Sequence, residues 1–286
     1  MPRILIFNGA PGDAQRRIAS LGAPTNEEMF STAVGAHAKP GEAMEFFSIN
    51  VADGERLPQG VSLADFDGVT ITGSPLNIYS DVPAVRGQIE YAREVFNTGI
   101  PVFGACWGLQ LMSAALGGKV RLNPNGREFG VARNITLNEA GREHAMYRGK
   151  PDAFDALCSH EDEVEALPAC GRLLASNAMS RVQAAEMVDG DNSFWGVQYH
   201  PEFQFKLLAA LFTARLTRQM TEGIMRDEAD AHAMADDFRA IGENKDRKDL
   251  AWRYGITRDI LDNGIKTAEF RNWLDTKVRP YAAKRA

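Results

Sequence analysis

The sequence predicts an α/β protein, with an open, mainly parallel β-sheet flanked by helices and a helical extension at its C-terminal end. Short apolar runs, typical of buried parallel strands, alternate with segments of helical spacing in the N-terminal part. From Phe203 onward the apolar residues recur at helical spacing only. Because the carboxyl ends of parallel strands meet at one edge of a sheet, we expect the reactive side chains to gather there.

The first elements of the chain follow this alternation. Residues 3–7 are almost continuously apolar and predict a central strand. The turn after it, Asn8–Gly12, lacks both the G-x-G-x-x-G pattern and the Walker lysine pattern of phosphate-binding loops. Next, the sequence predicts a helix, a strand, a polar loop and a second helix, over residues 26–37, 43–51, 52–64 and 84–98. A β-rich region follows over residues 119–200.

A cysteine between two glycines follows the next predicted strand. The apolar run 100–103 leads into Gly104, Cys106 and Gly108, and an amphipathic segment then covers Leu111–Leu116. Strand, sharp turn and helix in that order are typical of a nucleophile elbow, here with sulfur in place of a serine oxygen. The glycines fit this interpretation, because a strained turn leaves no room for side chains two positions away. The dipole at the start of the helix favours a thiolate.

A second motif lies far along the chain and supports a catalytic cysteine. By itself, a buried cysteine near a helix start is more often a small core residue. Residues 196–203, however, read as a strand that ends at His200, with Glu202 two positions further on. A histidine that takes a thiol proton needs a third group to hold its tautomer, and a carboxylate supplies that. We therefore predict a Cys106–His200–Glu202 triad.

These residues resemble the class I (triad-type) glutamine amidotransferase domain, and free-standing members of that family in particular. The resemblance runs from about residue 65 to residue 203. The segments that carry it are Asp67–Pro75, Gly104-x-Cys106-x-Gly108-x-Gln110, Ala115–Val120, Arg127–Gly130, Ser159–Asp162, Val182–Ala184 and His200-Pro201-Glu202. It implies a flavodoxin-like α/β core and hydrolysis of a glutamine-like amide through a γ-glutamyl thioester.

The resemblance also implies the remaining site residues. The oxyanion of the tetrahedral intermediate is expected between the backbone N–H of Trp107 and that of Gly73 or Ser74. Gln110 and the Ser159-His160 segment are expected to hold the glutamyl part of the substrate, although Gln110 also fits an ordinary helix residue and His160 a loop histidine. Two departures stand out: Ser74 replaces the second glycine of a common Gly-Gly-Pro, and the indole of Trp107 is expected to shape the substrate pocket.

The composition is typical of a globular protein, and it argues against nucleic acid and membrane as partners. The net charge of −6 argues against non-specific binding to nucleic acid, and no apolar run is long enough to span a membrane. Three cysteines without paired spacing indicate a reducing compartment, so we expect a cytoplasmic protein in which Cys158 and Cys170 are core thiols. No cluster has zinc spacing, and we expect neither metal nor cofactor. The histidines at 37, 144 and 232 are expected to be structural or exposed.

The chain is long enough for one amidotransferase domain and an extension. We place the domain at residues 1–205 and the extension at 206–286, as about four short helices that cover the core or mediate a homodimer. Lys284-Arg285 is expected to fray.

Two enzymatic functions fit these observations. The chain is either a glutaminase subunit that supplies ammonia to a synthase partner, or a stand-alone hydrolase or transferase of γ-glutamyl amides or peptides. Two other classes fit less well. A dienelactone-hydrolase-like enzyme would use a separated Asp and His, and a non-catalytic module usually lacks a triad residue, whereas Cys106, His200 and Glu202 are all present.

Overall fold

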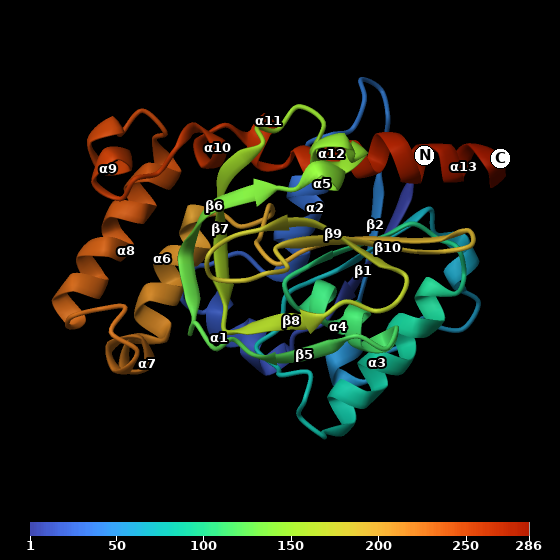
Figure 1. Cartoon of the computed structure of the whole chain (residues 1–286), viewed down its shortest axis with the longest axis horizontal. Helices are drawn as coiled ribbons and strands as arrows, with labels where there is room; N and C mark the ends of the chain where they lie inside the picture. The colour runs from blue at the N-terminus through green and yellow to red at the C-terminus, as the bar shows by residue number, and fades with distance from the viewer. Residues whose placement is uncertain (286) are drawn as a thin grey trace.

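The computed structural model describes residues 1–285 (Figure 1). A nine-stranded sheet forms its centre, in the order β2-β1-β3-β4-β11-β10-β9-β6-β7, and β5 pairs antiparallel with β8 in a separate two-stranded sheet. The strands are β1 (Arg3–Asn8), β2 (Glu45–Asn50), β3 (Gly68–Ile71), β4 (Val102–Ala105), β5 (Lys119–Leu122), β6 (Glu128–Leu137), β7 (Ala153–His160), β8 (Asp162–Ala166), β9 (Gly171–Ser176), β10 (Ala184–Asp189) and β11 (Asn192–Val197).

Helices surround this sheet, as predicted for an α/β protein. Those before the last strand are α1 (Gly12–Ala19), α2 (Asn26–Gly35), α3 (Pro83–Phe96), α4 (Trp107–Ala115) and α5 (Glu139–Glu143). Those after it are α6 (Phe205–Ala214), α7 (Leu216–Thr221), α8 (Glu228–Glu243), α9 (Lys248–Arg253), α10 (Arg258–Leu261), α11 (Asn263–Lys266), α12 (Ala268–Trp273) and α13 (Arg279–Arg285).

The sheet is mixed, and its two halves differ in strand direction. In one half, the neighbouring strands β2, β1, β3, β4 and β11 pair in parallel. The strands from β11 to β7 pair antiparallel. The parallel half is the part that the apolar runs predicted, and it places the carboxyl ends of β3, β4 and β11 next to one another.

Alternating side chains of the central strands fill two cores, one on each face of the sheet. In β1, Ile4 and Ile6 contribute to one core, and Leu5 and Phe7 to the other, as the two-residue period of a strand requires. Helices α3 and α4 complete the core that contains Leu5, whereas α2 and α12 complete the opposite one. Strand β4, which precedes the cysteine, is therefore held rigidly from both sides.

The C-terminal extension packs on the rest of the molecule at two places. Helices α6 and α8 build a third core with Leu208, Phe212 and Phe238. Farther along, α12 and the following π-helical turn return to the sheet, where Trp273 is fully buried beside Gly68 of β3. In Figure 1, α8 and α9 (orange) lie at one end of the molecule and the red C-terminal helix runs back across it.

The structure corrects three local predictions. Within residues 205–285 the extension has eight α-helices and not about four, and the side chains of Asp227 and Asp262 cap two of the additional helix starts. The end of the chain is not frayed at Arg285, whose guanidinium donates to Asp67 at 2.9 Å and to the carbonyl of Phe66. Helix α1 was not predicted, since it contains few apolar residues and buries only Gly12. No helix in the described residues has the length and apolar content needed to cross a membrane.

Candidate active site

Cys106 lies at a sharp turn between β4 and α4, as the sequence pattern predicted. Its φ of 53° and ψ of −100° are strained for a residue with a side chain. The backbone holds the strain, because the Cys106 N–H donates to the carbonyl of Val197 at 2.7 Å and its carbonyl accepts from Gln110 N–H at 3.1 Å. The turn presents the thiol at the carboxyl edge of the sheet.

The two flanking glycines are required by close backbone approaches. A Cβ on Gly108 would lie 2.7 Å from the carbonyl oxygen of Ile71, and one on Gly104 would lie 2.8 Å from the backbone of Gly108. Neither neighbour is a flexible side-chain end, so any larger residue displaces the elbow. The sequence interpretation of these glycines therefore has a direct steric basis.

His200 and Glu202 form a buried pair beside this turn. The Nδ1 atom of His200 lies 2.6 Å from Oε1 of Glu202, and both side chains are almost completely covered. The ring of Phe203 stacks on the imidazole, with 3.6 Å between the ring centroids. The backbone N–H of His200 also donates to the carbonyl of Leu157, at 2.8 Å. The imidazole is thus fixed in orientation, with its Nε2 edge left for other partners.

The electrostatics of this pair favour a protonated imidazole. Burial is the largest influence and lowers the pKa of His200, but the Glu202 carboxylate and the nearby Cys106 outweigh it and raise the pKa to about 9. A positively charged His200 stabilises negative charge on the sulfur of Cys106 and holds a proton for a departing group. The arrangement suits nucleophilic acyl chemistry.

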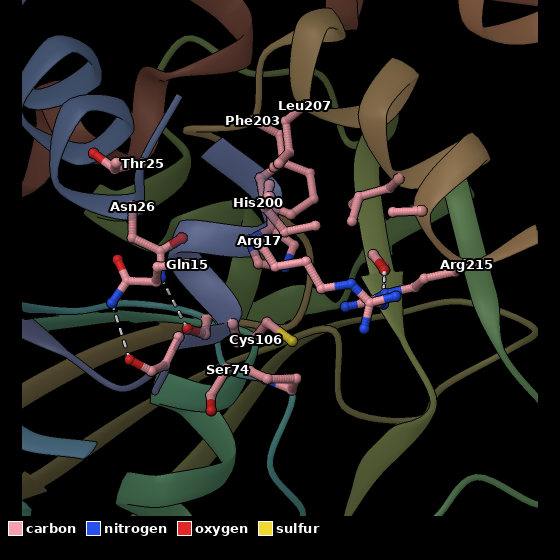
Figure 2. Close-up of a pocket in the computed structure, with 18 of the residues that line it drawn as sticks. Gln15, Arg17, Thr25, Asn26, Ser74, Cys106, His200, Phe203, Leu207 and Arg215 are labelled. Atoms are coloured by element: carbon pink, nitrogen blue, oxygen red, sulfur yellow. Dashed lines mark hydrogen bonds between the residues drawn. The ribbon is translucent and has the colours of Figure 1, made fainter. Parts of the chain in front are cut away.

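Two cavities meet at Cys106, and Figure 2 shows residues that line the first of them. The first encloses about 610 Å³ and contains His200, Phe203 and the Gly73–Pro75 loop as well as the thiol. The second encloses about 200 Å³ and contains Gln110 and the segment 159–162. Cys106 therefore borders open space on two sides.

The Gly73–Pro75 loop, which is expected to hold the oxyanion, is fixed by hydrogen bonds from other segments of the chain. The side-chain amide of Asn26 donates to the Gly73 carbonyl at 3.3 Å, and Thr72 joins the same network through Asn8 at 3.1 Å. The Ser74 hydroxyl accepts from Leu76 N–H at 3.2 Å, so this side chain turns into its own loop. A serine is compatible with a loop that uses only backbone N–H groups.

The Trp107 side chain does not shape the pocket, contrary to expectation. Its ring is fully buried in the core on the α3 side of the sheet, and its Nε1–H donates to Gln88 at 2.9 Å. Helix α4 starts at Trp107, and the side chain of this residue packs toward α3, where Gln88 holds it. Only its backbone lies at the turn next to Cys106.

The residues expected at the glutamyl end lie together along the second cavity. The amide of Gln110 donates to the carbonyl of Asp162 and to Gln198, both at 3.2 Å. Both nitrogens of His160 are engaged, with Glu128 at 2.9 Å and the Asp162 carbonyl at 3.1 Å. The His160 imidazole therefore has a structural partner on each side, whereas the Ser159 hydroxyl lines both cavities.

The remaining histidines have hydrogen-bond or ion-pair partners away from the thiol, and the remaining cysteines are buried or partly buried. His37 bonds Thr267 at 2.8 Å, His144 pairs with Glu186 at 3.1 Å, and the exposed His232 lies 3.5 Å from Glu228. Burial raises the pKa of the Cys158 thiol well above its usual value and raises that of Cys170 to a smaller extent.

Sequence reasoning missed three residues around the thiol. Asn26 fixes the Gly73 carbonyl, and Arg17 and Arg215 line the first cavity. Arg17 comes from the unpredicted α1 and Arg215 from the junction of α6 and α7. Single polar residues on helices carry no signal in one sequence, so only the fold reveals them.

Comparison with known protein families identifies the class of protein to which this fold and its cysteine elbow belong. The model of the glutamine amidotransferase class-I family matches residues 38–215, and the chain belongs to that family. This confirms the resemblance on which the sequence prediction was based.

Individual relatives match large parts of the chain. A γ-glutamyl-L-1-hydroxyisopropylamide hydrolase from Pseudomonas sp. is 32% identical over 233 residues, which are 78% of this chain and 76% of the relative. One subunit of the GMP synthase (glutamine-hydrolyzing) from Sulfolobus acidocaldarius is 36% identical over 49% of this chain and 69% of its own length. The fold resembles the crystal structure of a glutamine amidotransferase from Thermotoga maritima, with a TM-score of 0.66, 18% identity, and 97% and 98% of the two chains covered.

Proposed function

We propose that this chain hydrolyses γ-glutamyl amides with Cys106 as nucleophile and His200, oriented by Glu202, as general base and acid. The observation that carries the proposal is the single cavity that contains both the Cys106 thiol on its strained turn and the His200–Glu202 pair. Family membership supplies the class of reaction.

The reaction proceeds in two halves. The sulfur of Cys106 attacks the γ-carbonyl carbon, the C–N bond breaks, and His200 gives its proton to the departing nitrogen. Water, deprotonated by His200, then adds to the thioester carbonyl, and the C–S bond breaks. The products are glutamate and an amine, or ammonia when the substrate is glutamine.

Backbone N–H groups stabilise the tetrahedral oxyanion in this mechanism. Trp107 is the first residue of α4, so its N–H has no partner within the helix. In a trans peptide the carbonyl and the following N–H point in opposite directions. Because the Gly73 carbonyl points at Asn26, the N–H of Ser74 points the other way, and we assign it as the second donor in preference to that of Gly73.

A stand-alone hydrolase fits the site better than an ammonia-donating subunit. Helices α6 and α7 supply part of the first cavity's wall through Leu207, Leu211 and Leu216, so the extension shapes space that ammonia does not need. The hydrolase from Pseudomonas matches over 78% of the chain, and its name gives a γ-glutamyl amide as substrate. The GMP synthase subunit supports the alternative, in which a synthase partner receives ammonia.

Release of amine or ammonia by the purified chain alone tests the proposal. The substrates are glutamine and a set of γ-glutamyl amides and γ-glutamyl amino acids. We expect faster release from at least one γ-glutamyl compound than from glutamine. Negligible release from all of them, together with labelling of Cys106 by a glutamine-mimicking electrophile, would contradict a stand-alone hydrolase and favour the ammonia-donating role.

The pH profile of this reaction should have its alkaline limb near pH 9. The pKa of His200 is raised from 6.5 to about 9, so the imidazolium that protonates the leaving nitrogen persists well above neutral pH. We expect kcat/KM to fall as the pH rises through about 9. A fall centred below pH 8 would contradict the assigned role of the Glu202 carboxylate.

The stability of the fold should also fall as the pH rises, so the pH profile of activity needs a control for unfolding. A pKa raised in the folded state contributes stability that is complete below pH 6.5 and is lost as the pH rises through about 9. Circular dichroism at each pH separates loss of structure from loss of the catalytic proton.

A further inference from the structure

The two cavities divide the substrate at Cys106, and this division rests on the function proposed above. His200 lines the first cavity and is absent from the lining of the second. Because His200 protonates the departing nitrogen, the leaving amine must lie in the first cavity. The glutamyl part then occupies the second, beside Gln110 and Ser159.

The first cavity is built for a leaving group much larger than ammonia. Its volume is about 610 Å³, and one wall is apolar. The side chains of that wall come from α1, from α6 and α7 and from the segment after β11, and are Ile18, Phe203, Leu207, Leu211 and Leu216. An amine with an aliphatic body would cover this surface, whereas ammonia would leave it exposed.

Arg215 lines both cavities where they meet, and its guanidinium has no acidic partner in the described part of the chain. Within residues 1–285 its guanidinium makes one hydrogen bond, at 3.4 Å to the Ser159 hydroxyl, and no carboxylate lies within 4.0 Å. Its neighbours differ: Arg127 and Arg218 both pair with Glu161 and with Glu222. Burial, followed by the charges of these two arginines, lowers the pKa of Arg215. Cys106 and Glu161 oppose this lowering, but no carboxylate of residues 1–285 is in direct contact with the half-buried guanidinium.

Arg17 brings a second cation to the same space. It is exposed on α1, lines the first cavity only, and has no acidic partner among the described residues. Figure 2 shows the side chains of Arg17 and Arg215 extending into the cavity on the same side of Cys106. The one acidic residue in the described lining is Asp13, which is exposed and accepts from the N–H of Ala14 at 2.8 Å.

We propose that the first cavity binds a leaving amine that carries both an aliphatic body and a carboxylate, with Arg215 and Arg17 recognising the carboxylate. The substrate class is then γ-glutamyl amino acids with apolar side chains, rather than glutamine or γ-glutamyl derivatives of neutral amines. Arginine suits this task because its planar fork can give a carboxylate two parallel hydrogen bonds.

A matched pair of substrates tests the carboxylate directly. γ-Glutamyl-leucine and the γ-glutamyl amide of 3-methylbutylamine differ only in the carboxylate of the leaving group. We expect kcat/KM of the wild-type chain to be about ten- to a hundredfold higher for γ-glutamyl-leucine, the range expected for one or two charge-assisted hydrogen bonds. A ratio near one would overturn the proposal.

Variants then assign the preference to the two arginines. Arg215→Met and Arg17→Met should each lower the ratio toward one, and Arg17 is exposed, so its variant gives a clear answer even if Arg215→Met folds poorly. Arg16→Met is the matched control, because Arg16 is exposed on the same helix and lines neither cavity. It should keep the wild-type ratio.

The remaining outcomes separate this inference from the proposed function. If Arg215→Met lowers kcat/KM for both substrates equally and Arg17→Met changes neither, Arg215 binds the glutamyl carboxylate and the leaving-group proposal is wrong. If the wild-type chain cleaves neither substrate of the pair nor any other γ-glutamyl compound, the proposed function itself fails.

Discussion

Replacing Cys106 by serine should abolish turnover while leaving the fold intact. We expect a loss of about four orders of magnitude or more in kcat, the range seen when the nucleophile of a triad is removed. A hydroxyl occupies the space of the thiol, but it is a weaker nucleophile than sulfur. The backbone contacts that hold the turn, such as Cys106 N–H to Val197, do not involve the side chain.

Amine release and the unfolding curve of Cys106→Ser together check this prediction. Cys170→Ser is the matched control, since Cys170 is only partly buried and lines neither cavity, and it should keep full activity. Substantial hydrolysis by Cys106→Ser would remove Cys106 from the role of nucleophile.

Glu202→Gln should lower kcat by about two to four orders of magnitude, and it should also remove the stability that the raised pKa of His200 contributes. The glutamine keeps the size of the side chain but removes the charge that raises the pKa of His200. Its amide can also turn an NH₂ group toward Nδ1, 2.6 Å away in the native pair, and so favour the wrong tautomer.

The pair of His144 with the partly buried Glu186 provides the control for this variant. His144 and Glu186 lie 3.1 Å apart and line neither cavity, so Glu186→Gln should leave kcat near the wild-type value. Equal losses in both variants would indicate that Glu202 acts through stability alone.

The parts of the site that the sequence predicted are those encoded in short patterns. Gly104, Cys106 and Gly108 lie within one turn, and the steric reason for each glycine is local or involves the neighbouring strand. His200 and Glu202 are two residues apart, so a strand end is enough to bring them together. The parallel strands were equally visible, because burial on both faces makes them continuously apolar.

The parts that were missed depend on contacts between distant segments. Arg215 meets Ser159 across 56 residues and Asn26 meets Gly73 across 47, and neither contact has a local signature. The inward turn of Trp107 depends on Gln88 of α3. The number of C-terminal helices was underestimated because spacing alone does not reveal caps inside a charged segment.

The division of the chain at residue 205 is still a proposal about folding. Trp273 is fully buried in the same core as Ile4 and Phe103, and Lys150 pairs with Glu269 at 2.5 Å. We therefore propose that residues 206–286 are an extension that unfolds together with the sheet, and not a separate folding unit.

Trapping the acyl-enzyme is the most direct test of the mechanism. The wild-type chain is mixed with a γ-glutamyl substrate that it turns over, quenched in acid during steady state, digested and analysed by mass spectrometry. We predict a γ-glutamyl group on the peptide that contains Cys106, and none on the peptides that contain Cys158 or Cys170. A γ-glutamyl group on another residue, or turnover of a rapidly cleaved substrate with no adduct even in single-turnover samples, would contradict covalent catalysis by Cys106.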